Sequence, residues 1–179
     1  LAAIDAKFDD KIGEIPKTTF HEFPLDKWKN SLNVNMTGTL NITQQVVKQM
    51  LKQNSGNIIN VASTYSLVSP NQNLYKFDDE DEQLFKPIDY VATKSMIPNF
   101  TRYLATFYGK YNIRANTIAP HGVVNNASEN FMKNFSKLSP LGRMCLKEEL
   151  RGPFIFLASD ASSYMTGSTL LVDGGWTAW

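Results

Sequence analysis

A tyrosine and a lysine four positions apart, Tyr90 and Lys94, are the residues whose types and spacing best suit acid–base chemistry in this sequence. On an α-helix, residues four positions apart lie on the same face. An ammonium group beside a phenol favours the phenolate, and so lowers the tyrosine pKa from its ordinary value of about 10. The pair is therefore predicted to exchange protons near neutral pH. The same spacing also occurs in surface pairs that do no chemistry.

Two other polar residues stand where a ligand could be bound. Ser63 directly follows residues 57–62, an apolar segment that is predicted to be a buried strand. Ligand sites of open α/β sheets lie at the carboxyl ends of strands, although a turn or helix cap is the ordinary alternative for a serine. Asn35 lies inside a predicted helix, where asparagine is disfavoured. Asn33 is equally polar, so the pattern does not choose between the two.

The elements that must position these side chains alternate between helix and strand. This alternation predicts an α/β fold with a parallel sheet. The patterns predict helices over residues 25–53, 88–109, 127–136 and 147–158, and strands over 57–62, 113–118 and 169–173. Residues 66–89 form a long excursion with two prolines and an acidic run at 78–82, and we expect a functional loop over the substrate pocket. The acidic run itself is interpreted as a solvated face.

Composition excludes several classes of protein. The chain has 179 residues, is 42% hydrophobic and has a net charge of +1, which does not suit a nucleic-acid or anionic-membrane surface. No apolar run reaches the ~20 residues of a membrane span. A single cysteine, Cys145, excludes an internal disulfide and favours a cytoplasmic location. His21 and His121 are too far apart in sequence for an ordinary zinc cluster, so no metal site is predicted.

Taken together, these motifs resemble the short-chain dehydrogenase/reductase family over nearly the whole chain. They occur in the order that the family shows. The matching pieces are Val34-Asn35-Met36-Thr37-Gly38, Ser63, Tyr90 with Lys94, Arg114-Ala115-Asn116 with Pro120, Ser162-Ser163-Tyr164-Met165-Thr166-Gly167 and Val172-Asp173-Gly174-Gly175. A softer likeness, carried by residues 140–144 and 173–179, is to bacterial flagellin-modification and sugar-modifying oxidoreductases. The ending at 172–175 argues against an extended epimerase, and the Tyr90 to Lys94 spacing argues against an enoyl-thioester reductase.

The resemblance implies a role for each matching residue. Tyr90 would be the general acid in carbonyl reduction and the base in alcohol oxidation, while Lys94 would lower its pKa and hold the nicotinamide ribose. Ser63 would stabilise charge on the substrate oxygen, and Asn35 would anchor a water relay to Lys94. NAD or NADP would also be bound by Pro120, Gly122, Val123 and Asn125, and the substrate by Ser63, Tyr65 and His121.

The sequence departs from the family pattern at three places in this site. The family's Pro-Gly reads Pro120-His121 here, and Asn125 replaces an expected threonine. His121 would therefore crowd the nicotinamide, face the substrate, or be a strained structural residue. Ser63 lies 27 positions before Tyr90, about twice the family's usual gap, because of the excursion at 66–89.

The largest departure is the absence of the family's glycine-rich turn, since no G-x-G-x-x-G occurs. The resemblance thus implies a Rossmann-like, doubly wound parallel sheet that is truncated at its N-terminal side and retains about three strands. Residues 1–179 would be one partial domain that lacks the glycine-rich half of the nucleotide site, with on the order of 90 residues missing.

Two functions are compatible with such a chain. In the first, it is the catalytic part of an NAD(P)-dependent oxidoreductase that acts on a small carbonyl or alcohol, such as a sugar derivative, and that is inactive when isolated. In the alternative, it is a non-catalytic interaction module. We favour the oxidoreductase, because a scaffold has no need of Asn35, Ser63, Tyr90 and Lys94 together. In both cases the helices over 25–53 and 88–109 are expected to form a homodimer or homotetramer.

Overall fold

The computed structural model describes residues 19–76, 84–125 and 128–179, and its centre is a parallel sheet of three strands. The strands are β1 (Gly56–Val61), β2 (Ile113–Pro120) and β3 (Thr169–Val172), and they lie side by side in that order. The predicted parallel α/β fold is therefore confirmed. Because the strands are parallel, their carboxyl ends meet at one edge of the sheet, where Ser63 and His121 lie just past β1 and β2.

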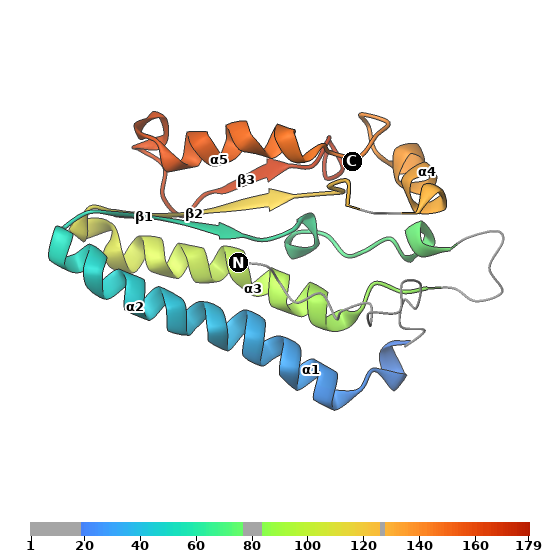
Figure 1. Cartoon of the computed structure of the whole chain (residues 1–179), viewed down its shortest axis with the longest axis horizontal. Coiled ribbons are helices and arrows are strands. Elements are labelled where there is room, and N and C mark those ends of the chain that lie inside the picture. The colour runs from blue at the N-terminus through green and yellow to red at the C-terminus, as the bar shows by residue number, and fades with distance from the viewer. Residues whose placement is uncertain (1–18, 77–83, 126–127) are drawn as a thin grey trace.

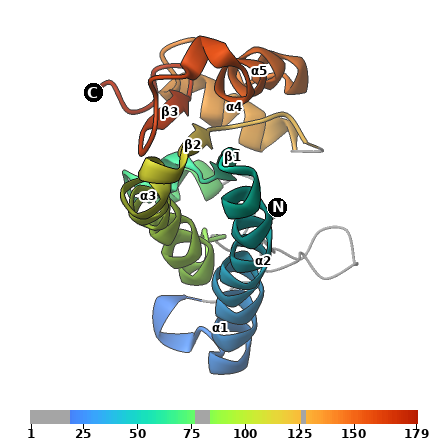
Figure 2. The ribbon, with the colours of Figure 1, turned by 90° about the vertical axis from the view of Figure 1, so that its left-hand side faces the viewer.

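Helices cover both faces of this sheet (Figures 1 and 2). Helices α2 (Gly38–Gln53) and α3 (Ile88–Tyr108) lie on one face, and α5 (Arg151–Ala158) lies on the other. Helix α1 (Leu25–Leu32) leads into α2, and α4 (Glu129–Leu138) lies beyond the carboxyl end of β2. Helices on both faces are what a buried parallel sheet requires, since both of its faces have to be covered.

The centre of the sheet is fixed by polar residues of β2. Arg114 donates hydrogen bonds to the carbonyl groups of Leu157, Ser159 and Met165. Asn116 is fully buried; its amide donates to the Met165 carbonyl at 2.8 Å and its Oδ1 accepts from the Ser168 backbone at 3.1 Å. These contacts hold the segment before β3 against β2. Part of the sequence motif at 114–116 is thus structural, because both Arg114 and Asn116 donate to backbone carbonyls of the segment 157–165.

The boundaries of several elements differ from the predicted ones. The first helix is interrupted by one turn of π-helix, Asn33–Thr37, and β2 continues two residues further, to Pro120. The segment 147–158 begins as a 3₁₀ turn, Lys147–Leu150, before α5. Helix α3 passes through Pro98, which is buried. The acidic run at 78–82 lies outside the described residues.

Candidate active site

Tyr90 and Lys94 lie in the first two turns of α3, on the side that faces the sheet. Lys94 is 7% exposed, and its Nζ donates a hydrogen bond to the Val61 carbonyl at the end of β1, at 3.0 Å. The same Nζ lies 5.9 Å from the centroid of the Tyr90 ring. Tyr90 itself is partly buried, and its backbone amide donates to Asp89 Oδ1 at 2.8 Å. The structure thus brings the phenol and the ammonium together beneath the carboxyl end of β1.

Asn35 lies in the π-helical turn and faces inward. Its side chain is 9% exposed, whereas Asn33 of the same turn is exposed, so burial distinguishes the two asparagines that the sequence left equal. The Asn35 carbonyl accepts a hydrogen bond from Thr39 Oγ1 at 2.6 Å. Single π-turns inside α-helices are frequent at functional sites, because they re-aim one or two side chains. Here the turn directs Asn35 into a cavity of about 300 Å³ that it shares with Lys94, Asn60 and Thr93.

Ser63 and Tyr65 form the turn that follows β1. Ser63 is 5% exposed, and its Oγ accepts from the Tyr65 backbone amide at 3.3 Å, which makes it the N-cap of a short 3₁₀ turn, Thr64–Ser66. In this structure the Ser63 side chain acts as a helix cap, the alternative that the sequence offered. Its role toward a substrate stays a prediction. The Tyr65 ring lies edge-on to the Tyr90 ring, with centroids 6.3 Å apart.

The segment 120–125, which the resemblance assigns to the nicotinamide, leaves β2 at the same edge of the sheet. Gly122 has φ +55°, a conformation that glycine adopts at little cost. Its carbonyl accepts from the Cys145 amide at 2.8 Å, and Val123 forms a bridge with Cys145. Asn125 is exposed. His121, in this segment, is connected to Tyr90 by ring contacts, since the Tyr65 ring lies edge-on to both side chains.

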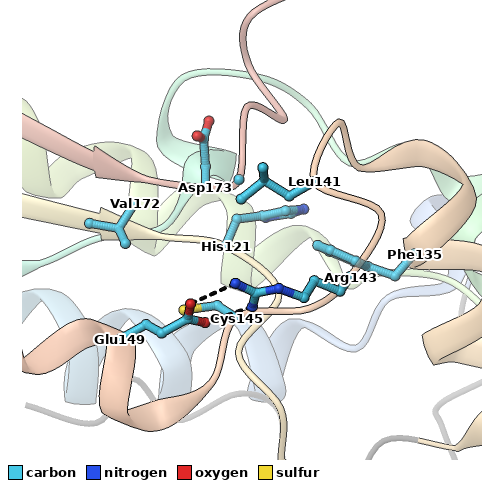
Figure 3. Close-up of a pocket in the computed structure, with 9 residues that line it drawn as sticks. His121, Phe135, Leu141, Arg143, Cys145, Glu149, Val172 and Asp173 are labelled. Atoms are coloured by element: carbon cyan, nitrogen blue, oxygen red, sulfur yellow. Dashed lines mark hydrogen bonds and ion pairs between the residues drawn. The ribbon is translucent and has the colours of Figure 1, made fainter.

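His121 is held inside an aromatic cluster. Its ring centroid lies 5.3 Å from that of Tyr65, 5.1 Å from Phe135 and 4.3 Å from Trp176, and the side chain is 6% exposed. Nδ1 pairs with Thr64 Oγ1, while Nε2 has no hydrogen-bond partner among the described residues. Figure 3 shows the ring between the end of β3 and Phe135, on the wall of a cavity of about 90 Å³. His121 is thus a packed residue of the loop that carries Gly122.

The electrostatics of His121 follow from this burial. Desolvation lowers the pKa of His121 to about 4; Asp173 opposes the shift and Lys86 adds to it. Burial raises the pKa of Asp173, but hydrogen bonds from Thr177 and Gly175 outweigh this effect and lower it.

On the opposite side of the cavity, Arg143 donates two hydrogen bonds to the Glu149 carboxylate, at 2.6 and 2.7 Å, and these lower the pKa of Glu149 to about 2. Figure 3 shows this ion pair beside Cys145.

The neutral state of His121 predicts a loss of stability on mild acidification. The unfolded chain binds a proton at this residue below pH 6.5, whereas the folded chain does so only near pH 4. Stability is therefore complete above pH 6.5 and falls as the pH drops toward 4. Between pH 7 and pH 5 we expect the free energy of unfolding to decrease by about 2 kcal/mol through this residue alone.

Urea unfolding at the two pH values measures the effect. His121→Gln should remove most of the difference, while His21→Gln, at an exposed position, should retain it. Equal pH dependence in the wild type and in His121→Gln would contradict the assignment.

Sequence reasoning missed several residues that the structure places at the site. Lys86 lies over the Tyr90 ring at 3.8 Å from its centroid, and Tyr75 places its hydroxyl 3.2 Å from that of Tyr65. Phe135 and Trp176 stack with centroids 4.9 Å apart. Lys86 precedes Tyr90 by four positions, a spacing that could have drawn attention to it. Pro87 intervenes, however, and α3 begins only at Ile88, so the pair does not share a helix.

Two findings concern metals and membranes. Within residues 19–76, 84–125 and 128–179, no group of three or more His, Cys, Asp or Glu side chains could hold a metal ion. No helix in this described part of the chain is long and apolar enough to cross a membrane.

With this geometry in place, comparison with known proteins defines the family. A model described as short chain dehydrogenase matches residues 12–76, and one described as Enoyl-(Acyl carrier protein) reductase matches residues 84–177, more than half of the chain. The chain belongs to the short-chain dehydrogenase/reductase family. The descriptions of the two models define this family and leave the substrate of the chain open.

Similar proteins come from several bacteria. The chain is 35% identical to a 2-dehydro-3-deoxy-D-gluconate 5-dehydrogenase of Dickeya dadantii (88% of this chain, 59% of the relative). It is 32% identical to the post-translational flagellin modification protein A of Campylobacter coli (89% and 61%), which bears out the softer likeness. A short-chain dehydrogenase of Leptospira borgpetersenii with bound NAD+ has a TM-score of 0.82 and 33% identity (92% and 62%). The chain thus spans about three fifths of the length of the relatives it matches.

Proposed function

We propose that the protein is an NAD(P)-dependent oxidoreductase that transfers hydride between a nicotinamide and a small carbonyl or alcohol substrate. The observation that carries the proposal is the placement of Tyr90 beside Lys94. The Lys94 ammonium, 7% exposed, donates to the Val61 carbonyl and lies 5.9 Å from the Tyr90 ring. An ammonium group near a phenol favours the phenolate, so the Tyr90 hydroxyl is suited to donating a proton to a substrate oxygen and to accepting one from it.

The described residues also fit the nicotinamide half of a dinucleotide. Asn35 and Lys94 line the cavity of about 300 Å³, and Gly122 turns the chain at the end of β2 through a positive φ angle. The bound nicotinamide would supply or accept the hydride. Lys94 and Tyr90 would hold its ribose, and Pro120, Gly122, Val123 and Asn125 would face its ring. NAD+ in the Leptospira structure and NADP in a gluconate 5-dehydrogenase of Burkholderia cenocepacia (29% identity, TM-score 0.80, 95% of this chain and 64% of that one) support this choice of cofactor.

The site residues would divide the remaining work between them. Tyr90 would move a proton at the substrate oxygen, and Lys94 would keep the phenol ready to do so. Ser63 would have to release its cap of the Tyr65 amide, or share its Oγ, to reach the substrate. Asn35 would hold water in the cavity that leads to Lys94. His121, being packed under α4, would shape the pocket through Tyr65 and would not itself contact the reacting atoms.

A sugar derivative is the substrate that we favour. The support is the set of names among the relatives, which include 2-dehydro-3-deoxy-D-gluconate 5-dehydrogenases and an L-rhamnose 1-dehydrogenase. The excursion at 66–89 would cover this substrate, because Tyr75 meets Tyr65 and Lys86 meets Tyr90. Its central part, residues 77–83, lies outside the described residues.

The 179-residue chain alone is expected to bind NAD(H) and NADP(H) too weakly for turnover. It contains no glycine-rich turn and spans about three fifths of the length of its relatives. The chain would therefore lack the contacts that such a turn makes with the adenosine and pyrophosphate of the cofactor. Isothermal titration calorimetry of the chain measures both affinities. A dissociation constant in the micromolar range for either cofactor would overturn this expectation.

An interaction role is the second candidate, and one observation favours it. Helices α2 and α3 expose apolar side chains: Leu40, Ile42, Val46 and Leu51 on α2, and Tyr103 and Phe107 on α3. We propose that these two helices associate with a second copy of the protein, as a homodimer or homotetramer. Sedimentation equilibrium tests the association directly, and a monomer at all concentrations would contradict it. A cytoplasmic location stays a prediction.

A further inference from the structure

Tyr90, the proposed proton donor, lies in the first turn of α3, which begins two residues earlier at Ile88. The amide groups of a first helical turn have no acceptors within their own helix, so this turn opens more easily than the turns that follow. Pro87, which precedes α3, provides no side-chain cap. The position of the Tyr90 phenol therefore depends on the contacts that this turn makes with the rest of the molecule.

Asp89 makes such a contact from inside the fold. Its side chain is fully buried; Oδ1 accepts a hydrogen bond from the Tyr90 amide at 2.8 Å, and Oδ2 accepts one from Ser31 Oγ. Ser31 lies on α1 and is 3% exposed. A buried carboxylate costs free energy unless its oxygens are paired, so Asp89 depends on the Ser31 hydroxyl. One side chain thus caps the first turn of α3 and links it to α1.

The helix to which Asp89 is linked also carries Asn35. Ser31 lies about one turn before Asn35, and α1 continues through the π-turn into α2. On α3, Thr93 Oγ1 donates to the Asp89 carbonyl at 2.8 Å, and Thr93 lines the cavity of about 300 Å³ together with Asn35. The hydrogen bond between Ser31 and Asp89 therefore joins the two helices that carry the site residues, at the end where the site lies.

We propose that Asp89 is a positioning residue: held by Ser31, it fixes the first turn of α3 so that the Tyr90 phenol meets the substrate oxygen. This inference rests on the proposed function, because it takes Tyr90 as the acid. Asp89 is fully buried, so it acts through Tyr90 and does not contact the substrate. A displacement of about 1 Å can slow an enzyme by roughly 10²-fold. Loss of the link should therefore slow the chemical step more than it weakens binding.

Ser31→Ala removes the hydroxyl that holds Asp89. The natural protein is assayed with NAD(H) and NADP(H) and a panel of sugar-derived carbonyls and alcohols, and the variant with a substrate on which the wild type acts. We expect kcat to fall by about 10- to 100-fold, while the KM values of substrate and cofactor stay within about 3-fold of those of the wild type. Urea unfolding identifies a temperature at which each variant is fully folded, so that lost stability does not lower kcat.

Amide hydrogen exchange, followed by NMR, measures the link without any turnover. The Tyr90 amide should exchange at least about 10-fold faster in Ser31→Ala than in the wild type, because the first turn of α3 opens more easily when its carboxylate cap is loosened. Amides in the middle turns of α3 should keep their exchange rates.

Two substitutions of Asp89 separate the contacts of this side chain from its charge. In Asp89→Asn, the amide oxygen can accept from the Tyr90 backbone and the amide nitrogen can donate to Ser31 Oγ. This variant should keep kcat within about 3-fold of the wild type. Asp89→Ala loses both contacts and should be at least as slow as Ser31→Ala.

Ser162→Ala is the matched control. Ser162 is 1% exposed, and its Oγ donates to the Leu157 and Ser159 carbonyls in the turn after α5, which lies on the face of the sheet opposite α3. Its variant removes a buried serine hydroxyl in the same way as Ser31→Ala. It should keep both the kcat and the Tyr90 exchange rate of the wild type.

The outcome is separable from that of the proposed function. A kcat of Ser31→Ala equal to that of the wild type, a loss that falls on KM alone, unchanged exchange of the Tyr90 amide, or Asp89→Asn as slow as Asp89→Ala would each overturn the role of Asp89. All four leave the oxidoreductase in place, since the wild type still transfers hydride. A wild type that transfers none would refute the proposed function and this role together, and exchange that still depends on Ser31 would then show a purely structural contact.

Discussion

Tyr90→Phe is expected to lower kcat for carbonyl reduction by about 10²–10⁴-fold, the usual contribution of a positioned general acid. The substitution removes only the phenolic oxygen, so the ring contacts with Tyr65 and Lys86 remain. Cofactor affinity should change far less than kcat, because Lys94 keeps its hydrogen bond to the Val61 carbonyl and still holds the ribose when Tyr90 loses its hydroxyl. Steady-state kinetics of the natural protein, together with a cofactor titration, measure the two quantities separately.

Tyr103→Phe is the control for this substitution. Tyr103 lies on the same helix as Tyr90, but it is 60% exposed and stacks on Phe107. Its variant should keep full turnover. If Tyr90→Phe also kept its turnover, Tyr90 would not be the acid.

Gly122→Ala is expected to destabilise the fold by about 2–4 kcal/mol. A Cβ at this position would lie 2.0 Å from Phe135 Cζ, and the backbone φ of +55° adds strain for any residue with a side chain. Phe135 cannot swing away at little cost, because it is 2% exposed and packed between His121, Trp176 and Phe131. Equilibrium unfolding in urea measures the loss.

Gly142→Ala separates strain from overlap. Gly142 also has a positive φ, +67°, but a Cβ there would have no atom within 4 Å. Its variant should lose only about 1–2 kcal/mol, the cost of the backbone conformation. Equal losses in the two variants would show that Phe135 gives way, and that the loop after β2 is not held by the aromatic cluster.

The sheet was predictable from the sequence because its strands are short apolar runs between helices of clear periodicity. Ile58, Ile59 and Val61 in β1 and Leu170, Leu171 and Val172 in β3 are strand formers beside a turn or a glycine. The Tyr90–Lys94 pair was also predictable, because two residues four positions apart on one helix lie next to each other on the same face.

Other parts of the site depend on tertiary contacts that no local pattern encodes. The π-turn at Asn33–Thr37 has no sequence signature, so Asn35 and Asn33 could be distinguished only by burial. The sequence left three interpretations of His121 open: contact with the nicotinamide, contact with the substrate, or a strained structural residue. Phe135 and Trp176, from α4 and from the segment after β3, enclose its ring. Lys86 reaches Tyr90 across Pro87 because Gln72 fixes its backbone, a contact between residues 14 positions apart.

Transfer of deuterium from the nicotinamide to the substrate tests the central claim most directly. The natural protein is incubated with NADH or NADPH that carries deuterium at C4, together with a panel of sugar-derived carbonyls, and the products are analysed by mass spectrometry. We predict an alcohol with one deuterium on the former carbonyl carbon, and its loss in Tyr90→Phe. A protein that binds the reduced cofactor but yields no deuterated alcohol, or that yields it equally in Tyr90→Phe, would contradict the account.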